Sequence, residues 1–335
     1  MTPQNELTDT SRELIDKNPN MESLFAPVPI PGLLMRPTAE EFSFLKQLTS
    51  TSGHSLRLLK VKAILKSSRY PDVPLFVNNL ALPFTGGLSE KNFFHSSWVQ
   101  AGGKSFIASQ APSSQNVFSF LSLIVHNKVK LVITLCDLNE IGQKCFQFWP
   151  DEEEKIFESF RVSLVEKQEI ENLIIRKVKV CQEENTFEFL HVHLTEWIDH
   201  SVLPPHRIQT FAFFLKFLFI FSTKKKEEKI TSSSIYYSPL MIKPLSSDES
   251  TLMRIFIRSE IDSGPILVHC AGGIGRTGTL LAGFELISQF NNSLVKGERP
   301  SVSVMEAVRI IREQRSGAVS EEAQFAFLYR LAKEF

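Results

Sequence analysis

The sequence predicts an α/β protein, and three observations support this fold class. The apolar run 265–269 is followed by a glycine-rich turn and then by apolar residues at helical spacing across 280–287, which gives the order strand, tight loop, helix. The segment 211–221 is dense in Phe, Leu and Ile and is interrupted by Lys216, so it favours a core helix over a membrane helix, which needs about 20 apolar residues. The length of 335 residues suits one large domain or two average ones, and either can bury an ample core.

The loop between the predicted strand and helix has the composition of an anion-binding site. Successive backbone N–H groups in such a turn point inward and meet the positive end of the following helix, which makes a cradle for a tetrahedral dianion. Cys270 lies at the floor of this cradle, where a thiolate is stabilised. Arg276 can reach back and grip two phosphate oxygens with its planar guanidinium. A buried cysteine alone is more often a small hydrophobe, but the whole pattern predicts a site where sulfur attacks phosphorus.

Two segments differ from the rest of the chain in composition. Residues 1–38 are polar and then rich in proline, which predicts a tail or loosely packed arm before a domain at 39–335. A lysine-rich run and a serine-rich stretch at 223–250 show no sustained apolar periodicity, and they predict a solvated surface insertion. The lysines at 224–226 leave a targeting or lipid-contact patch as the alternative.

Charge and cysteine content argue against several classes of protein. Lys+Arg and Asp+Glu balance at 37 each, so bulk attraction to nucleic acid or to a charged membrane surface is not expected. The cysteines at 136, 145, 181 and 270 have no CxxC spacing, which predicts neither a disulfide framework nor a metal site. The N-terminus is polar and has no signal-peptide apolar region. A reducing compartment suits a thiolate at Cys270, so we expect the cytoplasm, with the nucleus as an alternative.

The motif His269-Cys270-x5-Arg276-Thr277-Gly278 closely resembles the signature loop of the cysteine-dependent protein tyrosine phosphatases. The resemblance extends over residues 40–335 and implies one catalytic domain with a central mixed, highly twisted sheet flanked by helices. It implies a nucleophile, a phosphate-binding arginine and a hydrogen-bond donor to the departing thiolate at Cys270, Arg276 and Thr277, with His269 beside them. The phosphate-binding residues that it implies are Ala271, Gly272, Gly273, Ile274 and Gly275. Ala271-Gly272 stands where most members carry Ser-Ala, which makes the loop slightly more flexible but removes no catalytic atom.

Two further motifs match parts of the same family. The segment 68–73 resembles the phosphotyrosine-recognition loop, which implies that Tyr70 stacks on the substrate ring and that Asp72 accepts hydrogen bonds from the substrate backbone. A simple turn around Pro71 is the alternative. Around the core motif at 144–150, the resemblance implies that Glu140 buttresses the signature arginine and that Lys144 approaches the acid loop.

The segment 195–204 resembles the mobile acid loop, whose usual core is Trp-Pro-Asp. A phenolate leaving group needs a proton donor, and the resemblance gives this part to Asp199, with Trp197 as the hinge anchor. Ile198 replaces the usual proline, so the fixed backbone dihedral is lost and loop closure is expected to be slower or less populated. Asp199 as a helix cap is the alternative.

The segment 317–325 resembles the loop that orders the hydrolytic water, where family members generally carry two glutamines. Here Ser320 occupies the first of these positions, and only Gln324 remains. Ser320 precedes two glutamates, so we expect it to be the N-cap of a helix. Gln324 either positions the water or is a satisfied polar group beneath the site.

From the motifs and the resemblance we expect a monomeric signalling enzyme that hydrolyses phosphotyrosine in proteins through a phosphocysteine intermediate. No metal or organic cofactor is expected, because the loop itself supplies the positive potential. One alternative is a catalytically weak pseudophosphatase that binds phosphotyrosine, which the residues at 198 and 320 motivate. The other is a broader-range phosphatase that acts on phosphoserine/threonine or phosphoinositides.

Overall fold

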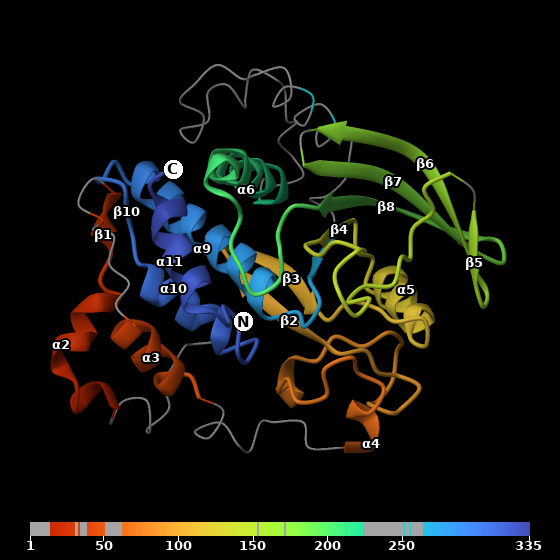
Figure 1. Ribbon diagram of the computed structural model, residues 1–335, viewed down its shortest axis with the longest axis horizontal. Helices are drawn as coiled ribbons and strands as arrows, with labels where there is room; N and C mark the ends of the chain where they lie inside the picture. The colour runs from red at the N-terminus through yellow and green to blue at the C-terminus, as the bar shows by residue number, and fades with distance from the viewer. Residues whose placement is uncertain are drawn as a thin grey trace.

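The computed structural model describes residues 14–30, 33, 39–50, 62–152, 154–170, 172–223, 251, 255 and 264–335. Their centre is a sheet in which eight strands follow the order β2-β3-β9-β4-β8-β7-β6-β5 (Figure 1). The strands in that order are β2 (Ser96–Ala101), β3 (Lys104–Ser109), β9 (Ile266–His269), β4 (Leu131–Thr134), β8 (Asn185–Leu194), β7 (Leu173–Gln182), β6 (Phe160–Ile170) and β5 (Lys155–Phe157).

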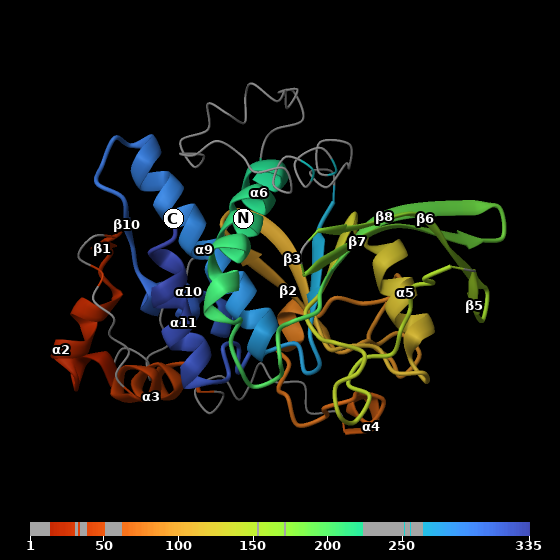
Figure 2. The ribbon, with the colours of Figure 1, turned by 45° about the horizontal axis from the view of Figure 1, so that its top comes forward.

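The sheet is mixed, as the sequence predicts. Strands β3, β9, β4 and β8 are parallel to one another, and the outer strands on both sides pair antiparallel. The twist between the β2–β3 edge and the β6–β8 end is clear in Figure 2. The expected α/β architecture with a twisted central sheet is therefore confirmed.

Helices cover both faces of the sheet, and the apolar residues of the central strand divide between them. On one face lie α6 (Ile208–Thr223), α9 (Gly275–Val295), α10 (Val304–Arg312) and α11 (Glu322–Ala332), and on the other lies α5 (Val117–His126) (Figures 1 and 2). Val268 belongs to the core under α6 and α9, whereas its neighbour Leu267 packs with residues of α5. Burial on both faces explains why β9 is a continuous apolar run.

The phenylalanine-rich segment is the core helix that its composition predicts. Leu215, Phe217 and Leu218 of α6 have no exposed surface. Within the part of the chain that the structure describes, no helix is both long and apolar enough to span a membrane.

Part of the N-terminal segment packs against the C-terminal helices. Its described elements are α2 (Pro19–Glu22), η1 (Ser23–Phe25) and β1 (Val28–Pro29). β1 pairs antiparallel with β10 (Ser301–Val302), and Phe25 contacts Phe44 of α3 (Ala39–Leu48) with ring centroids 6.5 Å apart. The domain boundary at residue 39 stays a prediction. The predicted insertion falls almost entirely on residues 224–250, which lie outside the described residues.

Candidate active site

The predicted order of strand, loop and helix is present at the centre of the molecule. β9 ends at His269, residues 270–274 form the loop, and α9 begins at Gly275. β9 lies between β3 and β4 with Val268 in register with Ala108 and Ile133, so Cys270 emerges at the carboxyl edge of the parallel strands. Cys270 is 2 % exposed. The fold therefore places a cysteine at the bottom of a loop that leads into the N-terminus of a 21-residue helix.

A buried arginine outside the loop holds its backbone in place. Arg315 has no exposed surface and donates to the carbonyl oxygens of Gly273 at 3.0 Å and Gly272 at 3.4 Å. Burial lowers the pKa of Arg315 to about 9, so it remains a cation at neutral pH. Because these carbonyl oxygens face Arg315, we expect the N–H groups of the loop to be available to a ligand on the side of Cys270. No local pattern in the sequence marks Arg315, because the segment before it already carries Arg309 and Arg312.

Gly273 has the backbone conformation and the surroundings that only glycine fits. Its φ is +68°, and a Cβ there would lie 2.2 Å from the carbonyl oxygen of Ser109. We expect Gly273→Ala to lower the free energy of unfolding by about 2 kcal/mol or more, because left-handed strain and a backbone clash combine. Urea denaturation measures this loss. Gly87→Ala is the matched control, since a Cβ at Gly87 meets nothing within 4 Å, and it should change stability by no more than about 0.5 kcal/mol. Equal stability of both variants would contradict the prediction.

Arg276 is fully buried and is held by three groups. Nη1 donates to Glu140 Oε1 and, at 2.7 Å, to the carbonyl oxygen of Trp197. Nη2 donates to Glu140 Oε2 at 3.0 Å and to Asp199 Oδ1 at 2.9 Å. Glu140 thus contacts Arg276 as the resemblance implies. Arg276 Nε and Thr277 Oγ1 are buried and have no hydrogen-bond partner among the described residues. Buried polar groups normally have a partner, so this pair favours an anionic ligand beside Cys270.

The acid loop lies over Arg276, and its aspartate is ionised. Asp199 Oδ2 accepts a hydrogen bond from Lys144 Nζ at 2.5 Å. Partial burial raises the pKa of Asp199, but the hydrogen bond from Lys144 and the charge of Arg276 outweigh it, so the pKa lies below its ordinary value. Asp199 precedes no helix start: η5 (Pro205–Arg207) begins after Pro204. The alternative that Asp199 is a helix cap is therefore wrong.

Trp197 fixes the start of this loop in the core. Its side chain is 1 % exposed, and its ring contacts Phe211 of α6 edge-on with centroids 5.2 Å apart. Nε1 donates to the carbonyl oxygen of Ser201 at 3.0 Å, which closes the turn. Ile198, by contrast, is 72 % exposed. The isoleucine that replaces proline therefore adds no packing that would hold the loop.

The predicted recognition loop stands beside the signature loop. The Tyr70 ring lies 3.7 Å from the position of a Cβ on Gly272. Burial raises the pKa of Tyr70, and the charges of Lys144, Asp199 and Cys270 also act on it, which places the phenol among the groups described above. Gln110 clamps Tyr70 on both sides, accepting from its N–H at 3.0 Å and donating to its carbonyl at 2.8 Å. Asp72 is exposed.

A family model described as protein-tyrosine phosphatase matches residues 65–334. The chain belongs to the protein-tyrosine phosphatase family. Tyrosine-protein phosphatase 69D of Drosophila melanogaster is 27 % identical over 277 residues, which cover 78 % of this chain and 16 % of that protein. Receptor-type tyrosine-protein phosphatase H of Homo sapiens is 28 % identical over 234 residues, 69 % of this chain and 17 % of that protein. Tyrosine-protein phosphatase 2 of Dictyostelium discoideum is 24 % identical over 253 residues, 74 % of this chain and 56 % of that protein. The chain thus spans less than two thirds of the length of each of these relatives.

Solved structures share the fold of this phosphatase. A structure from work on the PTPN18 fingerprint on distinct HER2 tyrosine phosphorylation sites aligns with a TM-score of 0.67 and 19 % identity, covering 97 % of this chain and 98 % of that one. A complex of PTPN18 with a HER2-pY1248 phosphopeptide aligns with a TM-score of 0.65 and 20 % identity, covering 88 % and 97 %. At this identity the likeness establishes the fold alone.

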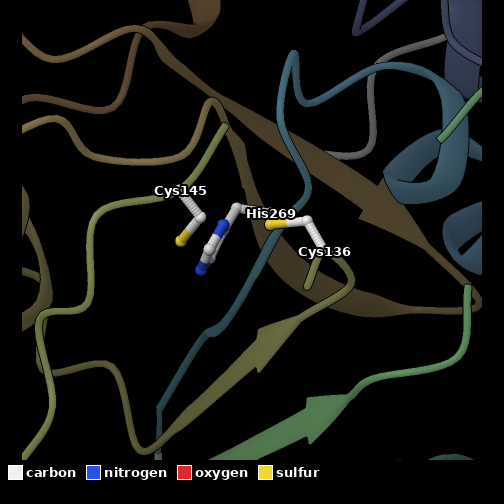
Figure 3. Close-up of side chains that lie close together, drawn as sticks. All are labelled: Cys136, Cys145 and His269. Carbon is white, nitrogen blue, oxygen red and sulfur yellow. The ribbon is translucent and has the colours of Figure 1, made fainter. Parts of the chain in front are cut away.

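Behind the signature loop of this phosphatase lies a buried cluster of two thiols and an imidazole. Figure 3 shows the sulfurs of Cys136 and Cys145 pointing toward the ring of His269, and the three donor atoms lie within 4.8 Å of one another. Burial lowers the pKa of His269 to about 3, and its Nε2 bonds to the hydroxyl of Thr134 at 2.7 Å. A hydrogen bond with Cys145, together with burial, raises the pKa of Cys136. Cys136 and His269 are therefore neutral, and His269 hydrogen-bonds within the protein directly before Cys270.

The N-cap of helix α11 differs from the sequence prediction. Helix α11 begins at Glu322, and its N-cap is Glu321, which forms a capping box with Gln324. The prediction that Ser320 is the N-cap is wrong, because the helix starts one residue later and the longer carboxylate of Glu321 reaches the helix amides. Gln324 is 1 % exposed, and its Nε2 donates to the carbonyl oxygen of Ser201 at 3.4 Å. Ser320 Oγ lies 2.8 Å from the position of a Cβ on Gly275, so this loop touches the start of α9.

Proposed function

We propose that this phosphatase hydrolyses phosphotyrosine in proteins through a phosphocysteine intermediate. The observation that carries the proposal is a pair of buried donors without a partner among the described residues, Arg276 Nε and Thr277 Oγ1, in the first turn of the helix that follows the Cys270 loop. Family membership supports the reaction class. A cysteine nucleophile needs a reducing environment, which favours a place in the cytoplasm or nucleus.

In the first step, Cys270 Sγ attacks the phosphorus in line while Asp199 gives a proton to the tyrosyl oxygen. The S–P bond forms as the P–O bond to the phenol breaks. Arg276 and the loop amides hold the equatorial oxygens, whose charge spreads in the loose transition state. Arg276 is prepared for this because Glu140 and the Trp197 carbonyl fix its position before substrate arrives.

The protonation of Asp199 follows from the entry of the substrate. In the free protein Asp199 is ionised, held by Lys144 and Arg276. A phosphate dianion that binds Arg276 places negative charge beside this carboxylate, and like charges favour the protonated form. Binding of the substrate therefore raises the pKa of Asp199, the acid that protonates the leaving phenolate.

In the second step, water attacks the phosphocysteine with Asp199 as the base. The S–P bond breaks, and the Thr277 hydroxyl donates to the departing thiolate. Gln324 is proposed to position this water, since it is a buried amide that contacts the acid loop through Ser201 and its side chain would be 3.1 Å from a Cβ on Gly275.

Selectivity for phosphotyrosine is proposed to come from Tyr70. Its ring walls the site above Gly272, so a phenyl phosphate reaches Cys270 between aromatic and backbone surfaces. Asp72 is exposed and free to accept hydrogen bonds from a peptide backbone.

The proposal is tested with four substrates: a phosphotyrosyl peptide, the same peptide with phosphoserine, phosphoinositide vesicles and a small aryl phosphate. We expect turnover of the phosphotyrosyl peptide far above that of phosphoserine or lipid. Tyr70→Ala should reduce turnover of the phosphotyrosyl peptide several-fold more than that of the small ester, because stacking is worth about 0.5–1.5 kcal/mol.

Each other result favours a different function. Preference for lipid or phosphoserine would favour the broader-range enzyme. Binding of the phosphotyrosyl peptide without turnover of any substrate would favour the pseudophosphatase, which Ile198 and Ser320 motivate. An equal loss on all substrates in Tyr70→Ala would make Tyr70 a structural residue.

A further inference from the structure

One ion pair joins the acid loop to the N-terminus of α11. His200 Nδ1 lies 2.9 Å from Glu321 Oε1, and His200 Nε2 lies 3.6 Å from Asp199 Oδ2. We propose that His200 and Glu321 are a positioning pair that holds the acid loop closed and keeps Asp199 over Cys270. This inference rests on the proposed function, in which Asp199 is the acid.

The backbone at His200 has a conformation that a contact from outside the turn can stabilise. Its φ is +54°, a left-handed conformation that is uncommon for residues other than glycine. Within the loop, Ser201 Oγ donates to the Ile198 carbonyl at 2.6 Å, and the Trp197 indole donates to the Ser201 carbonyl at 3.0 Å. These bonds shape the turn, but they all lie inside it. Outside the turn, Lys144 and Arg276 bind the carboxylate of Asp199, and Arg276 also binds the Trp197 carbonyl. The contact between His200 and Glu321 adds a restraint that does not use the acid itself.

The contacts of the loop to α11 single out Glu321. The other described contact there is Gln324 Nε2 to the Ser201 carbonyl, which is long at 3.4 Å. Ile198 is exposed and lacks the backbone restraint of proline. Glu321 is itself anchored, because it caps α11 and lies 3.4 Å from Ser320 Oγ. The pair therefore supplies a restraint that the residue at position 198 does not.

The solvent exposure of His200 and Glu321 sets the expected size of their effect on loop closure. The side chains of His200 and Glu321 are 72 % and 37 % exposed, and solvent-exposed ion pairs shift an equilibrium only about two- to fivefold. Both imidazolium and the neutral imidazole with its proton on Nδ1 can donate to Glu321, so the contact does not require a charged His200.

A double-mutant cycle tests the pair. His200→Asn keeps a residue type that tolerates a left-handed backbone, and Glu321→Ser keeps a good N-cap, but both side chains are too short to span the gap. Each single variant should lower kcat about two- to fivefold for phenyl phosphate, whose leaving group needs the acid, with little change in KM or in turnover of 4-nitrophenyl phosphate. The double variant should lose no more than either single variant. His126→Ala, an exposed histidine at the end of α5 on the other face of the sheet, is the matched control.

Three outcomes would overturn the inference. Multiplicative losses in the double variant would show that the two residues act independently. Equal losses for both esters, together with a lower melting temperature, would show a structural contribution only. Unchanged kcat in both single variants would show that the pair does not hold the loop. If the wild type turns over neither ester, the proposed function itself fails, and this result is distinct from all three.

Discussion

Replacing Cys270 with serine is expected to lower turnover of a phosphotyrosyl peptide by a factor of about 10⁴ or more. The serine hydroxyl does not ionise where a thiol does, so the nucleophile is lost. The loop amides and Arg276 stay in place, because Arg315 and Glu140 hold them independently of the sulfur. The phosphopeptide should therefore bind with close to wild-type affinity. Steady-state kinetics and fluorescence anisotropy with a labelled peptide measure the two quantities.

Cys181→Ser is the matched control for this experiment. Cys181 lies on β7, where its sulfur is 4.0 Å from the Thr186 hydroxyl, and its replacement should leave turnover unchanged. Residual activity of Cys270→Ser within about tenfold of the wild type would contradict the thiol mechanism, since loss of an activated nucleophile lowers turnover far more.

Replacing Asp199 with alanine is expected to lower kcat for phenyl phosphate by about 10²–10⁴-fold and kcat for 4-nitrophenyl phosphate much less. Only the poorer leaving group needs a proton as its bond breaks. The measurement is kcat for a series of aryl phosphates, plotted against the pKa of the phenol. The slope should be steep in Asp199→Ala and shallow in the wild type.

Asp199→Asn separates the proton from the shape of the side chain. Asparagine keeps the size of the side chain, and its single carbonyl oxygen can accept from Arg276 or from Lys144 but not from both. It cannot act as the acid, so its leaving-group slope should match that of Asp199→Ala. A uniform loss for every ester in both variants would show that Asp199 positions Arg276 and transfers no proton.

The sequence predicted those parts of the fold and site that are encoded locally. The strand at 265–269 and its loop were recognisable because an apolar run, glycines and a helical repeat follow one another directly. The helix at 211–221 was recognisable from its composition alone. The nucleophile and its arginine lie within this one short motif, so their proximity needed no knowledge of tertiary structure.

What the sequence could not supply depends on contacts between distant segments. Gln110 clamps Tyr70 across 40 positions, and His200 reaches Glu321 across 121. No local pattern marks either contact. The N-cap of α11 was misplaced by one residue because serine and glutamate are adjacent there, and only the backbone geometry decides which one caps the helix. The pairing of β1 with β10 also joins segments far apart in the sequence, and no local pattern in the arm at 1–38 marks it.

The hydrogen bond from Arg276 to the Trp197 carbonyl couples two equilibria through one side chain: oxyanion binding and closure of the acid loop. The guanidinium that is proposed to bind phosphate also holds Trp197, the residue that anchors the acid loop. Thermodynamic linkage then requires reciprocity: if closure of the loop strengthens the grip on an oxyanion, the oxyanion stabilises the closed loop by the same factor. An inhibitor can therefore gain affinity from this arginine without touching the loop. Conversely, a substitution that favours the open loop weakens oxyanion binding in proportion to the closed fraction that it removes, however far from Cys270 it lies.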